Sequence, residues 1–405
     1  MPDSSLALAP PSLFRRLFIS LLAVAFGLFL ALLLVEILLH FYNPFLARIK
    51  GNHIVLQANM TRRFHNGSIA GLDPDIVVTR NALGFRGPNP PPDFASYLKI
   101  FAVGGSTTHG VLSSEGKTWP ALAAASLDAS FRKLWVNNAG LDGHSTFGHA
   151  ILLADQVLPQ HPQVVLLLIG ANDVAASEPN GHDAESLRGA GISFSDPKKF
   201  VKAISTYSEI AALGLNIYRS WVAYRAGLPH AALDLTHIGT VNLTEAEQQA
   251  RINSTARPEL LEAYRQRVLG LVNSTRQAGA VPILITQPTL WGQGIDDITG
   301  INLALARLPV GNGETSWRIL ERYNDVTRSI CAATQTPCID LAHQLPKSRL
   351  IFYDSLHYTN EGNRQTGAIV SAFLCPLLKE RFPNHASGPC PSPTSVFSKP
   401  NEPQR

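Results

Sequence analysis

Cysteine is scarce in this chain and is not arranged for metal binding. Four cysteines occur among 405 residues, all of them late: Cys331, Cys338, Cys375 and Cys390. Because no Cys-x-x-Cys pair is present, a zinc ribbon is not expected. An even number of cysteines beyond an apolar N-terminal segment favours an oxidising compartment, in which the simplest pairing joins sequence neighbours. Four reduced, buried cysteines are the alternative.

Charged residues are also few. They make up 16% of the chain against 45% hydrophobic residues, and the formal net charge is only +4. Lysine and arginine form no dense stripe, so the electrostatic footprint of a nucleic-acid-binding protein is missing. We therefore expect no nucleic-acid partner. The apolar excess lies at one end of the chain.

That excess is concentrated in Leu17–Leu39, where Ser20 and Glu36 are the only strongly polar residues. A helix of this length spans about 34 Å, enough to cross a hydrocarbon core of about 30 Å. A secretory signal peptide is the alternative, but its apolar region is normally shorter and ends in a cleavage site that is missing here. We predict a transmembrane anchor at 17–39, with residues 1–16 in the cytoplasm and the rest extracytoplasmic, periplasmic or extracellular.

Composition divides the remainder into three parts. Residues 40–97 are rich in Asn, Pro, Gly and Arg, which is typical of a stiff juxtamembrane connector. Residues 98–380 alternate β-rich runs with helical stretches, the pattern of a parallel sheet with crossover helices. A helical, aromatic insertion at about 176–256 is too long for a simple crossover, and packs as a satellite, caps the site or lies against the membrane. Residues 381–405 are predicted to be a disordered tail.

Five β-rich runs are predicted to be strands of one sheet: 98–103, 134–138, 164–169, 281–286 and 337–341. The third, VVLLLI, is continuously apolar, as expected for a central strand that is covered on both faces.

A serine that can act as a nucleophile follows the first of these strands. Ser106 stands on a glycine turn in the sequence GGST, and its oxygen needs a general base within hydrogen-bond reach. Far downstream, Asp354-x-x-His357 offers an imidazole and an acid that can orient it. For the first motif alone, a glycine turn with a helix-capping serine is the alternative.

Donors that can stabilise an oxyanion follow the next two strands. Gly143, or alternatively Gly140 in the same block, can present a bare backbone N–H, and Asn172 adds a side-chain amide. Acyl transfer needs two or three such donors, each typically worth about 3–4 kcal/mol of barrier. The open edge formed by the carboxyl ends of parallel strands is where α/β folds bind ligands.

In order along the chain, the blocks GGSTT, NAGLDG, GAND and DSLH resemble those of the SGNH, or GDSL-type, hydrolases. The resemblance covers roughly residues 98–375. It implies an α/β, flavodoxin-like three-layer sandwich with a five-stranded parallel sheet, preceded here by one N-terminal transmembrane helix. By position it also implies that Ser106 is the nucleophile, that Asp354 and His357 complete the triad, and that Gly143 and Asn172 join the Ser106 N–H in an oxyanion hole.

One block departs from the family pattern, because Gly105 stands where the family has an acid. The triad does not use that acid, so hydrolysis is still expected. A membrane-anchored subgroup with the GGST form and a preceding G-F-R segment looks most similar. If so, Arg86 of that segment buttresses the sheet or lines the site, with a surface arginine as the alternative. Trp291 either walls a substrate groove or lies in the core.

Three histidines near the expected site, His109, His144 and His149, match no metal-binding spacing. A serine site for acyl transfer requires no metal, so neither a metal nor another cofactor is expected. Asp173, next to the amide donor, is predicted to be a turn or cap residue rather than a second acid.

These features predict a membrane-anchored serine esterase that removes small acyl groups, such as acetyl, from a surface glycan. A lipid esterase or lysophospholipase, and an O-acyltransferase acting on glycan, would use the same residues. A non-catalytic protein that uses this fold to bind a glycan or a partner is the alternative of another class. The intact catalytic positions argue against it.

Overall fold

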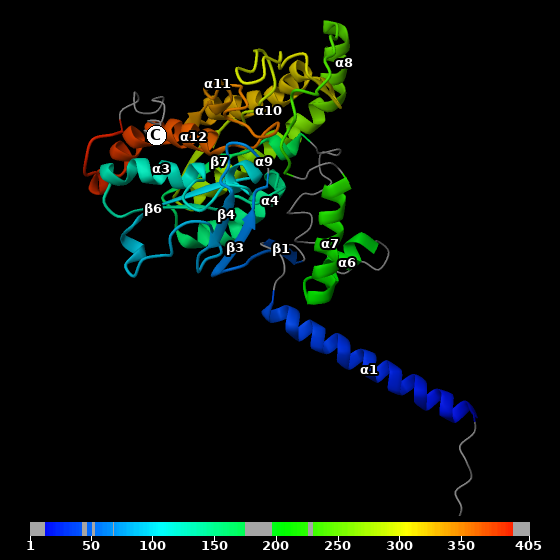
Figure 1. Ribbon diagram of the computed structural model, residues 1–405. Coiled ribbons are helices and arrows are strands. Elements are labelled where there is room, and N and C mark those ends of the chain that lie inside the picture. Colours follow the sequence, from blue (N-terminus) through cyan, green and yellow to red (C-terminus); the bar gives the residue numbers. More distant parts are fainter. Residues whose placement is uncertain are drawn as a thin grey trace, which may run out of the picture.

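A five-stranded parallel sheet organises the main domain (Figure 1). The computed structural model describes residues 13–42, 47–50, 53–67, 69–174, 197–225 and 230–391. The strands of the sheet are β5 (Leu98–Gly104), β6 (Leu134–Asn138), β7 (Val164–Leu168), β8 (Val281–Ile285) and β11 (Cys338–Ile339). Each coincides with a run predicted from the sequence, although β11 is shorter than expected.

The spatial order of the strands is β6-β5-β7-β8-β11, and all neighbours pair in parallel. Counted along the chain this is 2-1-3-4-5, the order of flavodoxin-like folds. The order reverses between β5 and β7: the connection after β5 leads to β6 on one side of the sheet, and the connection after β7 leads to β8 on the other side. Open α/β sheets bind ligands beyond the carboxyl ends of the strands at such a reversal.

Helices cover both faces of the sheet: α3 (Trp119–Leu127), α4 (Thr146–Leu152), α9 (Pro258–Gln277), α10 (Gly313–Thr334) and α12 (Asn360–Arg381). Successive residues of β5 serve opposite faces, as in any strand. Ile100 and Ala102 pack with α3 and α12, whereas Phe101 and Val103 pack with α4, α9 and α10. β7 is divided in the same way, so the predicted three-layer α/β sandwich is confirmed.

Antiparallel hairpins occupy much of the stretch predicted to be a connector. β1 (Ala47–Lys50) pairs with β2 (His53–Leu56), and β3 (Met60–His65) pairs with β4 (Asp75–Arg80). The side chains of β3 alternate between exposed and half-buried. Because its exposed side carries the polar residues Thr61, Arg63 and His65, this strand has no apolar run from which the sequence could have predicted it.

One helix, α1 (Leu13–Phe41), extends away from the domain (Figure 1). An 18-residue window within Phe14–Phe41 has a mean hydropathy of 2.9 and none of that window is buried in the protein, so α1 is long and apolar enough to cross a membrane. The predicted apolar segment lies within it. A helix of this kind fits either a single-pass anchor or a signal sequence.

The described part of the predicted insertion is helical. It contains α6 (Pro197–Ile204), α7 (Glu209–Arg225) and α8 (Glu245–Thr255). Figure 1 shows α6 and α7 on the side of the domain from which α1 extends, while α8 lies beside α10. Residues 176–196 and 226–229 of the insertion lie outside the described residues.

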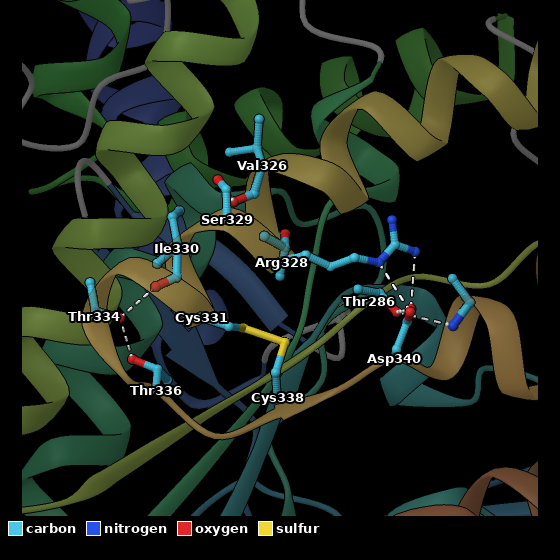
Figure 2. The surroundings of a disulfide bond; sticks show 12 residues. Thr286, Val326, Arg328, Ser329, Ile330, Cys331, Thr334, Thr336, Cys338 and Asp340 are labelled. Atoms are coloured by element: carbon cyan, nitrogen blue, oxygen red, sulfur yellow. Dashed lines mark hydrogen bonds and ion pairs between the residues drawn. A yellow bond between two sulfur atoms is a disulfide. The ribbon is translucent and has the colours of Figure 1, made fainter.

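Both disulfides join sequence neighbours, as the simplest pairing predicted. Cys331–Cys338 connects the end of α10 to β11, and Cys375–Cys390 connects α12 to the segment after it. Figure 2 shows the first bond beside the ion pair of Arg328 with Asp340, whose closest atoms are 3.0 Å apart. One disulfide and one ion pair therefore connect the short edge strand β11, and the residue after it, to α10.

Candidate active site

Ser106 lies where β5 ends and the short helix α2 (Ser106–His109) begins. Close packing requires both preceding glycines. A methyl group at Gly104 would lie 2.7 Å from the carbonyl oxygen of Leu168 at the end of β7, and one at Gly105 would lie 2.6 Å from Nδ2 of Asn172. The turn therefore holds Ser106 at the reversal of strand order, beside the loop that follows β7.

The structure brings Ser106, His357 and Asp354 into one hydrogen-bonded chain. Ser106 Oγ lies 2.7 Å from His357 Nε2, and His357 Nδ1 lies 2.7 Å from Asp354 Oδ2. Asp354 Oδ1 accepts the backbone N–H groups of Leu356 and His357, each at 2.8 Å. These local bonds fix the carboxylate within its own turn. With the carboxylate accepting from Nδ1, the second nitrogen of the ring faces the serine.

Hydrogen bonding keeps Asp354 ionised. Burial alone would raise its pKa, but the hydrogen bond from His357, the charge of that ring and the two backbone N–H groups outweigh burial and lower the pKa below 3.8. The carboxylate is therefore negatively charged throughout the neutral range, as a partner for a developing imidazolium must be.

Asn172 and Gly143 are positioned differently from Gly140. Asn172 Nδ2 donates one hydrogen bond to the carbonyl of His144, at 2.9 Å, which leaves its second N–H for another acceptor. Gly140 donates its N–H to the Asn138 side chain, at 2.8 Å, and packs against the backbone of α2. Gly143 has a φ of 71° and open space around its Cα. Of the two glycines, Gly143 is therefore the better candidate for a free donor.

Steric constraints explain why glycine, and not the acid of the family pattern, stands at position 105. Position 105 is filled on its side-chain side by the amide of Asn172 at 2.6 Å and by the carbonyl of His144 at 3.2 Å. Any side chain there would displace the amide. In this chain, Asn172 occupies the space that a longer residue before the serine would need.

Arg86 is not on the surface. Its side chain is fully buried, and its guanidinium donates to the carbonyls of His109, Gly110 and Ser113 at 2.7–2.9 Å, while Nε lies 3.3 Å from Glu115. The surface alternative is therefore wrong. Arg86 binds the carboxyl end of α2 and the loop after it, and so braces the segment that begins with Ser106.

Trp291 is 3% exposed and belongs to the cluster of core residues on the α3/α12 face. Asp173 is buried at the N-terminus of α4, where it accepts the backbone N–H and the hydroxyl of Thr146 and lies 3.3 Å from Arg267. Trp291 is therefore the core tryptophan of the two alternatives, and Asp173 caps α4, in line with its predicted turn or cap role.

His230, which sequence reasoning missed, packs against His357. Its ring meets that of His357 edge-on at 4.4 Å, while Tyr353 stacks on His357 from another side at 5.6 Å. His230 Nε2 lies 3.1 Å from both carboxylate oxygens of Asp142, the residue before Gly143. A lone histidine in a loop of the insertion carries no local motif that could have predicted this contact.

The contact between His230 and Asp142 also affects the pKa of the His230 ring. Burial would lower the pKa of His230, but its hydrogen bond with Asp142, and the charges of Asp142 and Asp354, raise it above 6.5. His230, Asp354 and His357 offer potential metal-ligand atoms within 4.8 Å of one another. However, both ring nitrogens of His357 already bond to Ser106 and Asp354, so the arrangement matches a hydrogen-bonded site better than a metal site.

Two further histidines near the site, His109 and His149, are buried, whereas His144 is half-buried. Burial and the charges of Arg80 and Arg86 lower the pKa of His109 well below 6.5, and burial lowers that of His149 to about 3. His109 accepts a hydrogen bond from Arg80 Nη2 at 3.1 Å. The two buried rings are neutral structural groups at neutral pH.

Two small hollows border Ser106. One, with an empty volume of about 190 Å³, is lined on its apolar side by Val111, Leu112 and Tyr353. The other, about 200 Å³, extends toward Gly105 and Asn172. Reacting groups can therefore approach the serine between an apolar hollow and the amide of Asn172.

Comparison with known proteins identifies the family of the chain. A family model described as the GDSL-like lipase/acylhydrolase family matches residues 102–365. No curated protein matches the chain. A lipase/acylhydrolase from Enterococcus faecalis is similar in structure, with 17% identity, a TM-score of 0.39, and coverage of 72% of this chain and 98% of that one.

An acetylxylan esterase from Geobacillus stearothermophilus is 14% identical with a TM-score of 0.36, and the match covers 70% of this chain and 93% of that one. The family model spans well over half of the present sequence, including the predicted nucleophile, the amide donor and the Asp-x-x-His turn. The chain belongs to the GDSL-like lipase/acylhydrolase family and is a hydrolase of ester bonds.

Proposed function

We propose that Ser106, His357 and Asp354 form the catalytic triad of a membrane-anchored esterase. The observation that carries this proposal is the continuous chain of 2.7 Å contacts from Ser106 Oγ through the imidazole to Asp354. Serine hydroxyls become effective nucleophiles when a base at this distance takes their proton and a third group orients the base.

In the first half-reaction, Ser106 Oγ attacks the ester carbonyl and His357 Nε2 takes the serine proton. The oxyanion receives hydrogen bonds from the Ser106 N–H, the Gly143 N–H and the Asn172 amide. His357 then gives its proton to the leaving alcohol, and the acyl group stays on Ser106. Water, deprotonated by His357, releases the acid and restores the serine. Asp354 stays ionised throughout and stabilises the imidazolium.

The substrate we propose carries a small acyl group, such as an O-acetyl group on a glycan. The apolar hollow at Ser106 supports this because it is small: the space open to the centre of a water-sized sphere is about 10 Å³, which corresponds to roughly one water molecule. A long acyl chain would extend beyond it. The apolar α1 and the two disulfides support an anchored domain in an oxidising, extracytoplasmic compartment.

Labelling with a fluorophosphonate probe tests the nucleophile. The full-length protein should label, Ser106→Ala should not, and Ser126→Ala, which alters an exposed serine on α3, should label like the wild type. Labelling that persists in Ser106→Ala would refute the assignment.

A series of p-nitrophenyl esters from acetyl to palmitoyl tests the acyl group. We expect kcat/KM to be highest for acetyl and to fall with chain length. A maximum at long chains would favour a lipid esterase instead. Product analysis with an acetylated glycan and an added glycan acceptor separates release of acetate from acyl transfer.

A further inference from the structure

Helix α7 exposes its apolar side and buries its polar side. Ile217, Tyr218 and Trp221 lie on one face, since positions three and four apart are neighbours on a helix. Their side chains are 50–59% exposed. The opposite face, which points into the protein, carries Glu209 and Asn216, both buried. A helix on a water-facing domain normally has the reverse arrangement.

The inward orientation of the polar face is held by specific bonds. Glu209 Oε1 lies 2.8 Å from Lys50 Nζ at the end of β1 and 3.6 Å from Nδ1 of His40 in α1. Turning the helix over would break the contacts that the buried Glu209 carboxylate makes with Lys50 and His40. The apolar face is therefore fixed outward. The preceding helix and turn add two more exposed apolar side chains, Val201 and Tyr207.

The position of α7 is tied to α1. Glu36, in the last two turns of α1, accepts hydrogen bonds from Ser208 Oγ and the backbone N–H of Ile210, each at 3.0 Å, and from the N–H of Glu209. A carboxylate is favourable at a helix N-terminus. Glu36 lies about 8 Å of helix rise before Phe41, so the start of α7 lies at the level where α1 leaves the hydrocarbon core.

We propose that α7, with α6, lies on the lipid surface beside α1 and inserts Ile217, Tyr218 and Trp221 into the headgroup–acyl boundary. Tyrosine and tryptophan are enriched at this boundary because one end of each ring system is apolar and the other polar. The interfacial surface rests on the proposed membrane anchoring by α1. In this arrangement Glu36 holds the start of α7 beside α1, and the insertion binds the lipid surface.

Quenching of tryptophan fluorescence by brominated lipid tests the proposal. The chain has five tryptophans, of which Trp119, Trp135 and Trp291 are buried, and α1 contains none. The full-length protein is reconstituted in phosphatidylcholine liposomes with and without phosphatidylcholine brominated near the headgroup. We expect brominated lipid to quench the wild type, and Trp221→Phe to lose most of that quenching. Trp317→Phe, a change in a half-buried tryptophan, should keep it.

Each other outcome is decisive. Equal quenching in wild type and Trp221→Phe would overturn the interfacial surface. Absence of quenching in protein that migrates as a dimer in detergent would show that a second copy covers this face, and would also overturn it. Failure of the protein to float with liposomes would instead refute the anchoring by α1. A further variant, Glu36→Ala, should float normally but lose at least half of the Trp221-dependent quenching, because α7 is no longer held beside α1.

Discussion

The carboxylate of Asp354 has a consequence for stability as well as for chemistry. Its pKa is lowered in the folded protein, so its bonds stabilise the fold above the ordinary pKa of about 3.9. That contribution is lost as the pH falls through the lowered folded value. We expect Asp354→Asn to be less stable than wild type at neutral pH, with a difference that narrows below pH ~4.

Urea unfolding from pH 3 to pH 7 measures this difference, and comparing the two proteins at each pH cancels the titration of the other carboxylates. A difference that does not change with pH would contradict the assigned bonds. The same variant should lose about 10³–10⁴-fold in kcat, because an amide favours the wrong tautomer of the ring.

Gly105 acts through Asn172, and a double-mutant cycle can test this. Asn172→Ala should lower kcat by about 10²–10³-fold through loss of one oxyanion donor. Gly105→Ala should lower kcat by about 10-fold or more, because its methyl group would displace the amide that lies 2.6 Å away. If that is its only effect, Gly105→Ala should change little in the Asn172→Ala background. Additive losses would contradict the coupling.

His230 ties the insertion to the loop that carries Gly143. Its Nε2 bonds to Asp142 at 3.1 Å, and its ring touches His357. We expect His230→Ala to lower kcat about 10-fold with a smaller change in KM, because the oxyanion donor and the base both lose a neighbour. His230→Gln, whose amide can replace Nε2, should recover part of the loss. Steady-state kinetics with a p-nitrophenyl acetate substrate measures both, and unchanged kinetics in His230→Ala would refute the role.

At the scale of the elements, Arg86 shows how a segment before the sheet supports the nucleophile. While fully buried, it donates three hydrogen bonds to carbonyl groups at the carboxyl end of α2 and in the loop after it, and a fourth to Glu115. Arg86→Ala should destabilise the protein by about 3–5 kcal/mol, since it leaves buried carbonyl groups without donors. Urea unfolding is the measurement. The matched control is Arg63→Ala on the exposed side of β3, which should change stability by less than about 0.5 kcal/mol.

The strands of the main sheet were predictable because a strand that is buried on both faces consists of a continuous apolar run, as in β7. The β3–β4 hairpin was not, because one side of β3 faces water and carries polar residues. Among site residues, Ser106 could be predicted from the glycine turn at the end of β5, and Asp354 and His357 from the Asp-x-x-His motif before α12. His230 could not be found in this way, since its role arises only from where the insertion folds back onto the site.

At the scale of the whole molecule, the disulfides close the carboxyl-terminal part. Cys375–Cys390 spans 15 residues, and within the loop that it closes Ser387 donates its N–H to the carbonyl of Ser130 and Ala386 forms a β-bridge with Phe131. Residues 382–391 of the predicted tail therefore contact the domain, while 392–405 lie outside the described residues. Replacing both cysteines by serine should lower the free energy of unfolding by about 3 kcal/mol.

This effect is measured by urea unfolding of the double variant against wild type, with wild type in dithiothreitol as a second comparison. Activity below the unfolding transition should stay at the wild-type level, because the bond is remote from Ser106. Equal stability of oxidised and reduced protein would contradict the pairing.

If α1 anchors the protein in a membrane, as proposed above, the short join between α1 and β1 limits how far the enzyme can reach. Ala47, the first residue of β1, follows Tyr42 by only five residues, which span at most about 18 Å when fully extended. A domain tethered so closely samples a thin layer above the bilayer and none of the solution beyond it. Within that layer its effective concentration is high, as for any short linker. Esters fixed in this layer would be hydrolysed repeatedly, whereas the same ester on a freely diffusing molecule would gain nothing from the tether.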